Sequence, residues 1–450
     1  MGMRSLVLLL PALLAAGDEP GKPIALKANP GAATVLHRSQ LLPPLEHAVG
    51  EAIVLGDRRI PARVTDKGAL ELDLHGDGKW KAFSKPGPVQ VPLEAEGPKP
   101  GQKRKLAVTL ALSRGEDKAW HYQNVTRLGF QIGADGVEVV DADGDGVWNE
   151  PGVDGMCWLG QEWVWPLPAK GDRWCTPGAE VSGFSCGPWG EDATATVRPL
   201  ATTLPATLPL LRNINDERAR IGLPPRPEDA ALSAPLQKHC AYMKGQNNLA
   251  HEEDKAKPGY SPEGHEAGMN SILGQGTPPE RLGTQMVATF YHRQDVIRPG
   301  TAGFGLGNDG AYSGIDGRRN LGAWKLQWPV LCPVPGQREV PLAFAPEMPD
   351  PINGDKEAGW PITVYFEKGA PKLVAASLKV KGQAAEVPCY RFDGAEGGKT
   401  DFNRFQHVVA LIAKDRLAPG TTYEVAMDTG EWKLAWEFTT TGAAAKGKGR

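Results

Sequence analysis

Helix signatures are concentrated in one central stretch of this sequence, residues 210–307, and this concentration most constrains the fold. In Leu210–Ile221, apolar side chains recur at intervals of three, four and seven residues, which is typical of an amphipathic helix. Thr277 is followed by two prolines and then by Glu280, a pattern that predicts a capped helix start. The same stretch holds four of the nine histidines. We therefore expect the functional site in this part of the chain.

The sequence on either side of this stretch is rich in turn-forming residues. The chain contains 55 glycines and 40 prolines, which exceeds average usage and favours turn-rich β modules. A chain of 450 residues is expected to form about three domains. In the C-terminal part, the segments that have the character of strands and are separated by turn signals are Ile362–Phe366, Leu373–Val380, Val408–Ile412 and Trp436–Thr440.

The first 17 residues have the pattern of a secretory signal peptide. Arg4 precedes the apolar run Leu6–Leu10, and the segment ends in the small residues Ala15–Gly17. No other apolar run in the sequence is long enough for a transmembrane helix. The sequence therefore predicts a protein without a transmembrane segment that is secreted, or held at the cell surface or in the periplasm.

Charge and cysteine content agree with this compartment. Lysine and arginine total 50 against 53 acidic residues, so the net charge of -3 provides no global field to attract nucleic acid or an anionic membrane. In an oxidising compartment the six cysteines can form disulfides. Spacing alone leaves their connectivity open, and Cys175 with Cys186 is the expected local bridge.

Several ordered motifs in residues 208–310 resemble the CAP superfamily, which is named for cysteine-rich secretory proteins, antigen 5 and pathogenesis-related 1 proteins. The resemblance implies an α-β-α sandwich, here expected over residues 208–325, with a cleft that can hold a divalent metal ion. Asn215–Arg218 with Ile221–Pro225 resembles the opening helix of the family, and Leu249–His251 resembles its first histidine motif. Ala267–Asn270 resembles its Gly-Glu-Asn motif. Tyr291–Arg293 resembles its second histidine motif, and Gly303–Gly307 resembles the strand that follows.

The resemblance implies that His251 and His292 line this cleft. Met269 stands where the family has a glutamate, and no acid lies where the family has its second one, so Glu252 and Glu266 are the candidate replacements. Imidazole suits zinc, and a zinc site can keep an open fourth position. The alternative is structural, with His251 ending a helix and His292 packing beside its neighbour as a polar core residue.

Near the C-terminus, Leu417–Tyr423 and Trp436–Thr441 resemble the closing strands of bacterial immunoglobulin-like domains, in which a tyrosine follows a Leu-x-Pro-Gly-Thr turn. This resemblance implies a β-sandwich over residues 336–441 that serves as a spacer or adhesive module. Residues 442–450, with their Ala, Lys and Gly repeats, are expected to form a disordered tail.

The N-terminal region contains a second candidate metal site. From Asp141 onwards, oxygen-bearing side chains occupy every second position, and glycines between them allow the sharp turn needed to wrap a hard cation. The segment resembles the first half of an EF-hand loop, but it follows a strand, and Gly152 occupies the position of the closing glutamate, so Asp154 or Glu150 must close the shell. The alternative is a solvated Asp-Gly hairpin turn. The predicted calcium ligands are Asp141, Asp143, Asp145, Val147, Asn149 and Asp154.

A degenerate copy of this loop lies earlier in the chain. Residues 70–80 match residues 138–148 in register, which suggests a duplicated strand-loop unit. In the earlier copy, His75 replaces a carboxylate and Lys79 replaces a neutral residue. Calcium is therefore not expected there.

Together these patterns predict a multidomain α+β protein, with a central α-β-α sandwich flanked by a β-rich module over residues 18–200 and a C-terminal β-sandwich. The favoured function is a secreted CAP-domain protein that is not an enzyme and binds an extracellular lipid, glycan or protein in a histidine-lined cleft. The alternative is a zinc-dependent extracellular hydrolase in which His251 and His292 hold zinc and Glu252 or Glu266 activates water. Binding is favoured because both family glutamates are missing.

Overall fold

The computed structural model describes residues 23–32, 37–39, 42, 45–96, 103–115, 118–168, 173–188, 190–200, 205–322, 328–352, 357–367, 369–393 and 407–442. The expected signal peptide and all but one residue of the expected tail lie outside these residues. The described residues are mostly β, with 41% in strands and 14% in helices. None of the helices in the described ranges is long and apolar enough to cross a membrane.

Four antiparallel sheets form the N-terminal region, with strand orders β3-β10-β9-β8, β4-β5-β6-β7, β14-β13-β12-β11-β2 and β1-β17-β16-β15. The strands are β1 Pro23–Ala25, β2 Asn29–Ala32, β3 Glu46–Ala48, β4 Ala52–Leu55, β5 Arg58–Val64, β6 Leu70–Leu72, β7 Lys81–Phe83, β8 Gly87–Glu96, β9 Lys103–Arg114, β10 Trp120–Asn124, β11 Thr126–Ile132, β12 Asp135–Val140, β13 Gly155–Trp158, β14 Trp165–Pro166, β15 Arg173–Thr176, β16 Ala179–Ser185 and β17 Thr194–Pro199.

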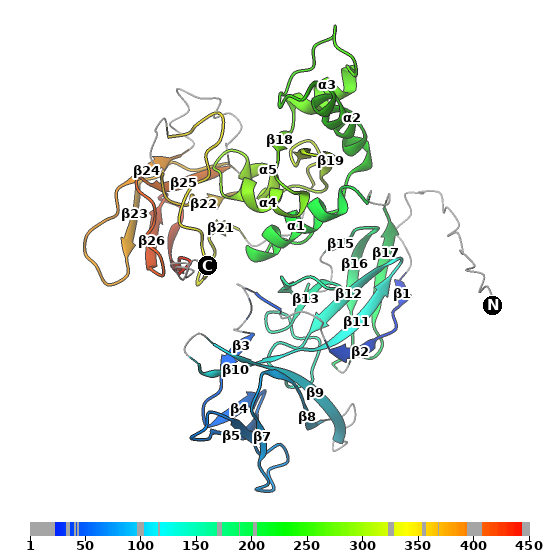
Figure 1. Cartoon of the computed structure of the whole chain (residues 1–450), viewed down its shortest axis with the longest axis vertical. Helices are drawn as coiled ribbons and strands as arrows, with labels where there is room; N and C mark the ends of the chain where they lie inside the picture. Colours follow the sequence, from blue (N-terminus) through cyan, green and yellow to red (C-terminus); the bar gives the residue numbers. More distant parts are fainter. Residues whose placement is uncertain are drawn as a thin grey trace, which may run out of the picture.

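The N-terminal region contains two hydrophobic cores. Strands β4 to β10 surround a core of their own that includes Ile53, Leu70 and Leu110. Strands β11 to β17 contribute to a second, larger core through residues such as Phe130 and Trp174. The two groups of strands are visible one below the other in Figure 1. The region expected to form one module over residues 18–200 is therefore built from two packing units.

The central region combines five helices with one sheet of order β18-β20-β19. Its elements are α1 Leu208–Arg220, α2 Ala230–Gln246, α3 Pro262–Met269, β18 Ile272–Gln275, α4 Pro279–Val287, α5 Arg293–Ile297, β19 Gly305–Asp309 and β20 Tyr312–Asp316. Asp229 starts α2 by accepting hydrogen bonds from two backbone N–H groups of its first turn. The predicted capped start at Thr277 is wrong, because α4 begins after Pro278 without a side-chain cap.

The expected α+β class with a central α-β-α sandwich is also wrong. The described residues form seven small sheets and five helices, and strand exceeds helix throughout the flanking regions. Helix α2 packs on β19 and β20, whereas α1 packs mainly against α4 and α5. The helix signatures are real, but they are confined to the five helices of the central region, within a chain whose glycine and proline content favours strands and turns.

The C-terminal region consists of two antiparallel sheets of order β21-β22-β25-β24 and β23-β26-β27. Its strands are β21 Val330–Cys332, β22 Ile362–Tyr365, β23 Ala375–Val380, β24 Cys389–Phe392, β25 Val408–Ala413, β26 Thr422–Asp428 and β27 Lys433–Thr439. The four segments expected to be strands are thus confirmed, with shifts of up to three residues at their ends. The hydroxyl of Tyr423 accepts a hydrogen bond of 2.8 Å from the N–H of Ala418 and so closes the turn before β26.

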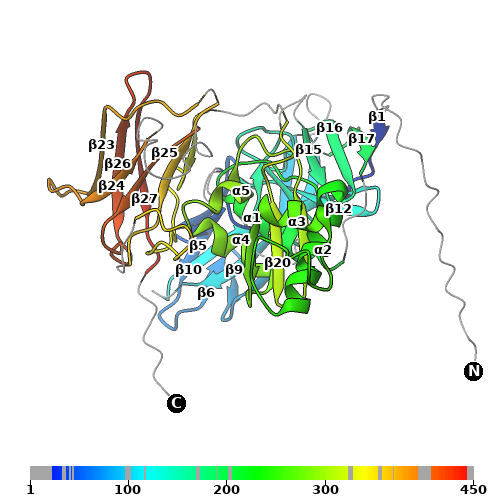
Figure 2. The same ribbon diagram turned by 90° about the horizontal axis from the view of Figure 1, so that it is seen from above.

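The central helices and the C-terminal sheets are joined by buried polar contacts. The guanidinium of Arg293 has no exposed surface and donates to the carbonyl oxygen of Pro361 at 2.7 Å and to the hydroxyl of Thr363 at 3.2 Å. The carboxylate of Glu347 accepts hydrogen bonds of 2.7–3.0 Å from the backbone N–H groups of residues 290–292. Figure 2 shows α5 beside the C-terminal sheets. One continuous hydrophobic core runs through all three regions.

Candidate functional site

The structure gives the two cleft histidines separate partners. Nδ1 of His251 hydrogen-bonds the carbonyl oxygen of Gly268 at 2.7 Å, and the ring is largely exposed. Nδ1 of His292 lies 2.7 Å from Oε2 of Glu347, a residue of the C-terminal region. Each histidine therefore has a structural contact of its own.

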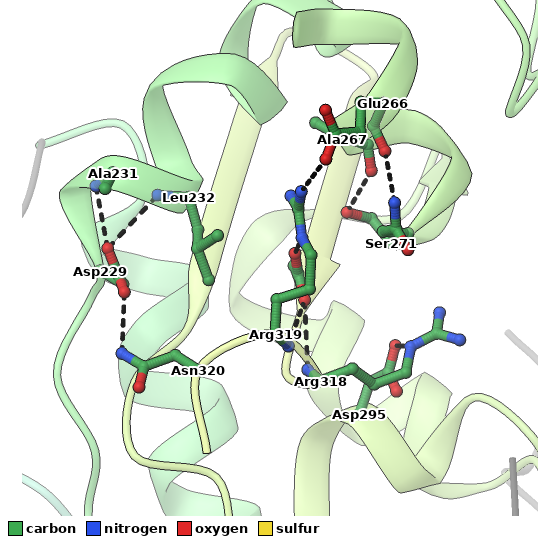
Figure 3. Close-up of polar contacts among 12 residues, drawn as sticks. Asp229, Ala231, Leu232, Glu266, Ala267, Ser271, Asp295, Arg318, Arg319 and Asn320 are labelled. Atoms are coloured by element: carbon green, nitrogen blue, oxygen red, sulfur yellow. Dashed lines mark hydrogen bonds and ion pairs between the residues drawn. The ribbon is translucent and has the colours of Figure 1, made fainter. Parts of the chain in front are cut away.

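The two candidate glutamates also lie outside any ligand group. Glu252 is exposed, and the carboxylate of Glu266 forms an ion pair of 3.5 Å with Arg319, as Figure 3 shows. Across the described residues, two groups of three or more side chains have the spacing of metal ligands, and neither group includes His251, His292 or these glutamates. The expected zinc ligands therefore do not form a group of three or more among the described residues.

The most buried histidine of the central region is one that the sequence did not single out. Nδ1 of His239 contacts Oε1 of Glu253 at 2.9 Å, and Nε2 of His239 contacts the carbonyl oxygen of Ala250 at 2.9 Å. The other oxygen of Glu253 accepts a hydrogen bond of 2.8 Å from the N–H of Ser261. Both ring nitrogens are therefore satisfied, which makes this pair a structural contact between α2 and the following loop.

The predicted calcium loop does form a compact acidic group. Oxygen atoms of Asp141, Asp143 and Asp145 lie within 4.8 Å of one another. Asp141 has no exposed surface, and its carboxylate accepts hydrogen bonds from the N–H groups of Gly144 at 2.7 Å and Gly146 at 3.0 Å. The backbone thus wraps around one buried carboxylate.

Glycine is required at the tightest point of this loop. Gly144 has a φ of +76°, a conformation that side chains rarely adopt. A Cβ atom at Gly144 would also lie only 2.6 Å from a methyl carbon of Leu55. The loop is pressed against the turn between β4 and β5, where the N–H of Gly56 donates to the carbonyl oxygen of Asp143 at 2.9 Å.

The remaining predicted ligands make different contacts. Asp154 is fully buried and accepts hydrogen bonds from the N–H groups of Ala142 at 3.3 Å and Glu150 at 3.1 Å, which holds it beside the acidic group. Asn149 instead directs its amide N–H toward the carbonyl oxygen of Cys186 at 3.2 Å. The backbone N–H of Val147 donates to Asp145 at 2.7 Å. One oxygen of Glu150 is buried and has no hydrogen-bond partner in the described structure.

The electrostatics of this acidic group are unfavourable without a cation. Burial raises the pKa of Asp141 well above its ordinary value, and Asp154, Asp143 and Asp145 raise it further. Burial likewise raises the pKa of Asp154 to about 7, and it raises the pKa of Asp145 and Glu150. Among the described residues, no lysine, arginine or histidine forms an ion pair with any of these acids.

A cavity of about 1080 Å³ opens beside the loop. Its walls include Asp143 and Asp145 from the loop, Arg58 and Arg59 from β5, and Tyr122 from β10. The cavity therefore lies between the two packing units of the N-terminal region, with the acidic loop as part of its wall.

All six cysteines are described and none forms a disulfide, so pairing of Cys175 with Cys186 stays a prediction for the oxidised protein. A second group of possible metal ligands involves one of these thiols and consists of His37, Glu138 and Cys157. Sequence analysis missed it because 120 residues separate the histidine from the cysteine, and neither residue belongs to a spaced motif.

Comparisons of this chain with models of known protein families, with curated proteins and with solved structures found no match. The resemblances to the CAP superfamily and to bacterial immunoglobulin-like domains therefore stay predictions from the sequence.

Proposed function

We propose that this chain is an extracellular, non-enzymatic binding protein whose N-terminal ligand cavity depends on a calcium ion held by the loop of residues 141–154. One observation carries the proposal. Asp143 and Asp145 belong both to the acidic group and to the wall of the large cavity. An ion bound there would stabilise the loop and present a positive charge at the edge of the cavity.

Calcium is the ion that best suits these side chains. Hard carboxylate and carbonyl oxygens in a flexible loop are its usual ligands, whereas zinc and copper prefer nitrogen and sulfur. Asp141 supplies the innermost carboxylate, and Asp154 and Glu150 lie where the shell must close. A divalent cation would offset the repulsion and burial that raise the pKa values of this group.

The cavity favours a polar ligand, and among the expected classes we propose a glycan. Its walls carry charges of both signs, since Arg58 and Arg59 line the cavity together with the acids of the loop. Tyr122 and His47 add a stacked pair of rings with centroids 5.3 Å apart. Hydroxyl-rich ligands can hydrogen-bond such charged groups and pack on rings. A lipid would instead need a predominantly apolar lining.

Two features support the extracellular location in this proposal. The first is the signal-like segment Met1–Gly17. The second is the calcium loop, because extracellular modules bind calcium with dissociation constants as weak as the millimolar range. We do not retain the zinc-dependent hydrolase as a second candidate. His251 and His292 have separate structural partners, and no observation in the described structure joins them to a third ligand.

The test measures calcium first and ligand second. The purified full chain is freed of metal, and calcium binding is followed by calorimetry, where we expect one site. The same protein is then applied to a panel of immobilised polysaccharides with calcium and with chelator. We expect binding to at least one polysaccharide in calcium alone, and loss of that binding in an Arg58→Ala, Arg59→Ala variant.

The outcomes separate the two parts of the proposal. Absence of calcium binding at millimolar concentrations would overturn the ion site and the proposed function together. Calcium binding without retention on any polysaccharide would keep the ion site and contradict the glycan ligand. Glu424→Ala, on a strand of the C-terminal region, provides a control substitution distant in the fold from the cavity.

A further inference from the structure

His37, Glu138 and Cys157 converge on one point at the sheet of order β14-β13-β12-β11-β2. Glu138 in β12 and Cys157 in β13 are directly paired across neighbouring strands, which Figure 1 shows side by side. His37 comes from the segment before β3 and approaches the same face. All three residues are buried, with exposed fractions of 3%, 0% and 0%.

The spacing of the three ligand atoms matches one face of a zinc tetrahedron. Nε2 of His37 lies 3.3 Å from Oε2 of Glu138 and 3.6 Å from Sγ of Cys157, and the third edge, from Sγ to Oε2, is 3.9 Å. Zinc bonds of about 2.0–2.1 Å to nitrogen and oxygen and about 2.3 Å to sulfur predict edges of roughly 3.3–3.6 Å in a tetrahedron. Two edges agree and the third requires a shift of a few tenths of an ångström.

The geometry is not that of a nucleophile activated by a base. In a catalytic Cys-His-acid arrangement the thiol and the carboxylate contact opposite nitrogens of the ring. Here the thiol and the carboxylate both contact Nε2 of His37, and Nδ1 of this ring has no hydrogen-bond partner in the described structure. Cys157 also has no exposed surface on which a substrate could approach.

The surroundings supply the charge that such a site needs. Nη1 of Arg127 lies 2.7 Å from Oε1 of Glu138, which holds this carboxylate with its other oxygen toward the cluster. Outer contacts of this kind orient the ligands of many metal sites. Thiolate and carboxylate together would neutralise a divalent ion, and binding would release the proton of the thiol. Burial, followed by Glu138, raises the pKa of the Cys157 thiol well above its usual range, so the metal-free thiol keeps its proton.

We propose that His37, Glu138 and Cys157 bind one zinc ion through Nε2, Oε2 and Sγ, with a fourth position left for water. The ion ties the segment of residues 37–39 to strands β12 and β13. Because all three ligands are buried, we assign this ion a structural role. The site is separate from the calcium loop and does not depend on the proposed function.

Cobalt(II) provides a probe that distinguishes this site from the calcium loop. The full chain is freed of metal under reducing conditions and titrated with cobalt while excess calcium occupies the oxygen-rich loop. A tetrahedral site with a thiolate gives intense visible bands and a near-ultraviolet sulfur-to-cobalt charge-transfer band, which an all-oxygen site lacks. We expect one equivalent of cobalt, displaced by zinc, which binds nitrogen and sulfur sites more tightly than cobalt.

Two cysteine variants make a matched pair. Cys157→Ser should abolish the charge-transfer band and weaken zinc binding at least a hundredfold. Cys175→Ser changes another fully buried cysteine of the same region that belongs to no ligand group, so it should keep both. His37→Ala offers an independent test should Cys157→Ser not fold. The His37→Ala variant should bind cobalt weakly or not at all, and it should contain less zinc after purification than the unmodified protein.

Three results would overturn the proposal. The first is absence of a charge-transfer band in the unmodified protein. The second is a band that persists in Cys157→Ser. The third is equal zinc content in the unmodified protein and the folded His37→Ala variant. Should Cys175→Ser lose zinc as well as Cys157→Ser, both serine variants have unfolded, and the comparison of folded His37→Ala with the unmodified protein decides.

Discussion

The loops of residues 73–80 and 141–148 have the same backbone design but different charges. In each loop a buried aspartate accepts two backbone N–H groups, from Asp77 and Gly78 in the first and from Gly144 and Gly146 in the second. Positive φ angles recur at matching glycines, at residues 76 and 78 and at residues 144 and 146. The duplicated unit inferred from the sequence thus has a counterpart in the structure.

The difference lies in where each loop finds its positive charge. Nζ of Lys79 lies 3.0 Å from Oδ2 of Asp77, and hydrogen bonding to Lys79 lowers the pKa of this exposed acid. The equivalent acid in the second loop is Asp145, half-buried against the β4–β5 turn, and its pKa is raised by burial. The first loop contains its own cation. The second loop has Val147 in place of the lysine, and in our proposal its cation comes from solution.

The largest expected effect distinguishes the buried aspartates of the two loops. Asp141→Asn removes one charge from the centre of the second loop and should lower calcium affinity about a hundredfold. Asp73→Asn, the matched control, should leave calcium affinity unchanged. Without calcium, Asp141→Asn should not destabilise the protein, because it removes repulsion among acids. Calorimetry and thermal unfolding with and without calcium measure both effects, and equal affinities for the two variants would contradict the comparison.

The second effect concerns pH. Burial, and then the charges of Asp143 and Glu150, raise the folded-state pKa of Asp154 to about 7, so between about pH 4 and pH 7 the folded chain holds a proton that the unfolded chain has released. The contribution of Asp154 to calcium-free stability is therefore greatest below pH 4 and should decline by about 4 kcal/mol between pH 4 and pH 7. Denaturant unfolding at a series of pH values measures this slope.

Two controls sharpen this pH test. Saturating calcium should abolish the decline, because the ion binds the ionised acids. Asp154→Asn should reduce the slope in the calcium-free protein. Stability of the calcium-free protein that rises between pH 5 and pH 8 would contradict the assigned environment of this acid.

The third effect compares equivalent glycines. Gly76→Ala and Gly144→Ala both place a side chain at positive φ, which costs about 1–2 kcal/mol. A Cβ at Gly76 meets nothing within 4 Å, whereas a Cβ at Gly144 lies 2.6 Å from Leu55. Gly144→Ala should therefore destabilise the protein by about 1–3 kcal/mol more, as measured by denaturant unfolding. Equal losses would show that the second loop is not pressed against the β4–β5 turn.

The smallest expected effect is the conversion of the first loop into a weak calcium site. In an Asp141→Asn background, His75→Asp with Lys79→Val restores the acid and removes the internal cation. We expect weak calcium binding, with a Kd on the order of 1 mM, because this loop is exposed and lacks a closing acid. Isothermal titration with calcium measures it. The same background with Lys79→Val alone should show no binding, and binding there would refute the role given to His75.

Sequence reasoning was most successful where the relevant contacts are local. The acidic group of the loop could be predicted because Asp141, Asp143 and Asp145 are close in sequence and their spacing largely fixes their proximity. The strands around Ile362 and Val408 were equally clear, since apolar β-branched runs between turns have few other structures available. In these cases the local sequence largely determines the local structure, and contacts with distant segments add little.

Sequence reasoning was weakest where distant segments meet. His251 and His292 were paired through a resemblance, but the partner of His292 is Glu347, which lies 55 residues later in the chain. The cluster around Cys157 depends on the packing of β12 and β13 against a segment 120 residues away from the cysteine. The fold class was wrongly predicted as α+β because helix periodicity is a strong sequence signal even when the helices are few, whereas short strands produce only weak sequence signals.

The buried junction at Arg293 and Glu347 limits how this protein can be divided or rearranged. A truncation ahead of β21 would leave the guanidinium of Arg293 without two of its acceptors and the backbone amides of residues 290–292 without theirs. The C-terminal sheets therefore behave as part of the central scaffold. A natural exchange of the C-terminal sheets for another domain would yield a working protein only if the new domain also supplied a carboxylate at the position of Glu347.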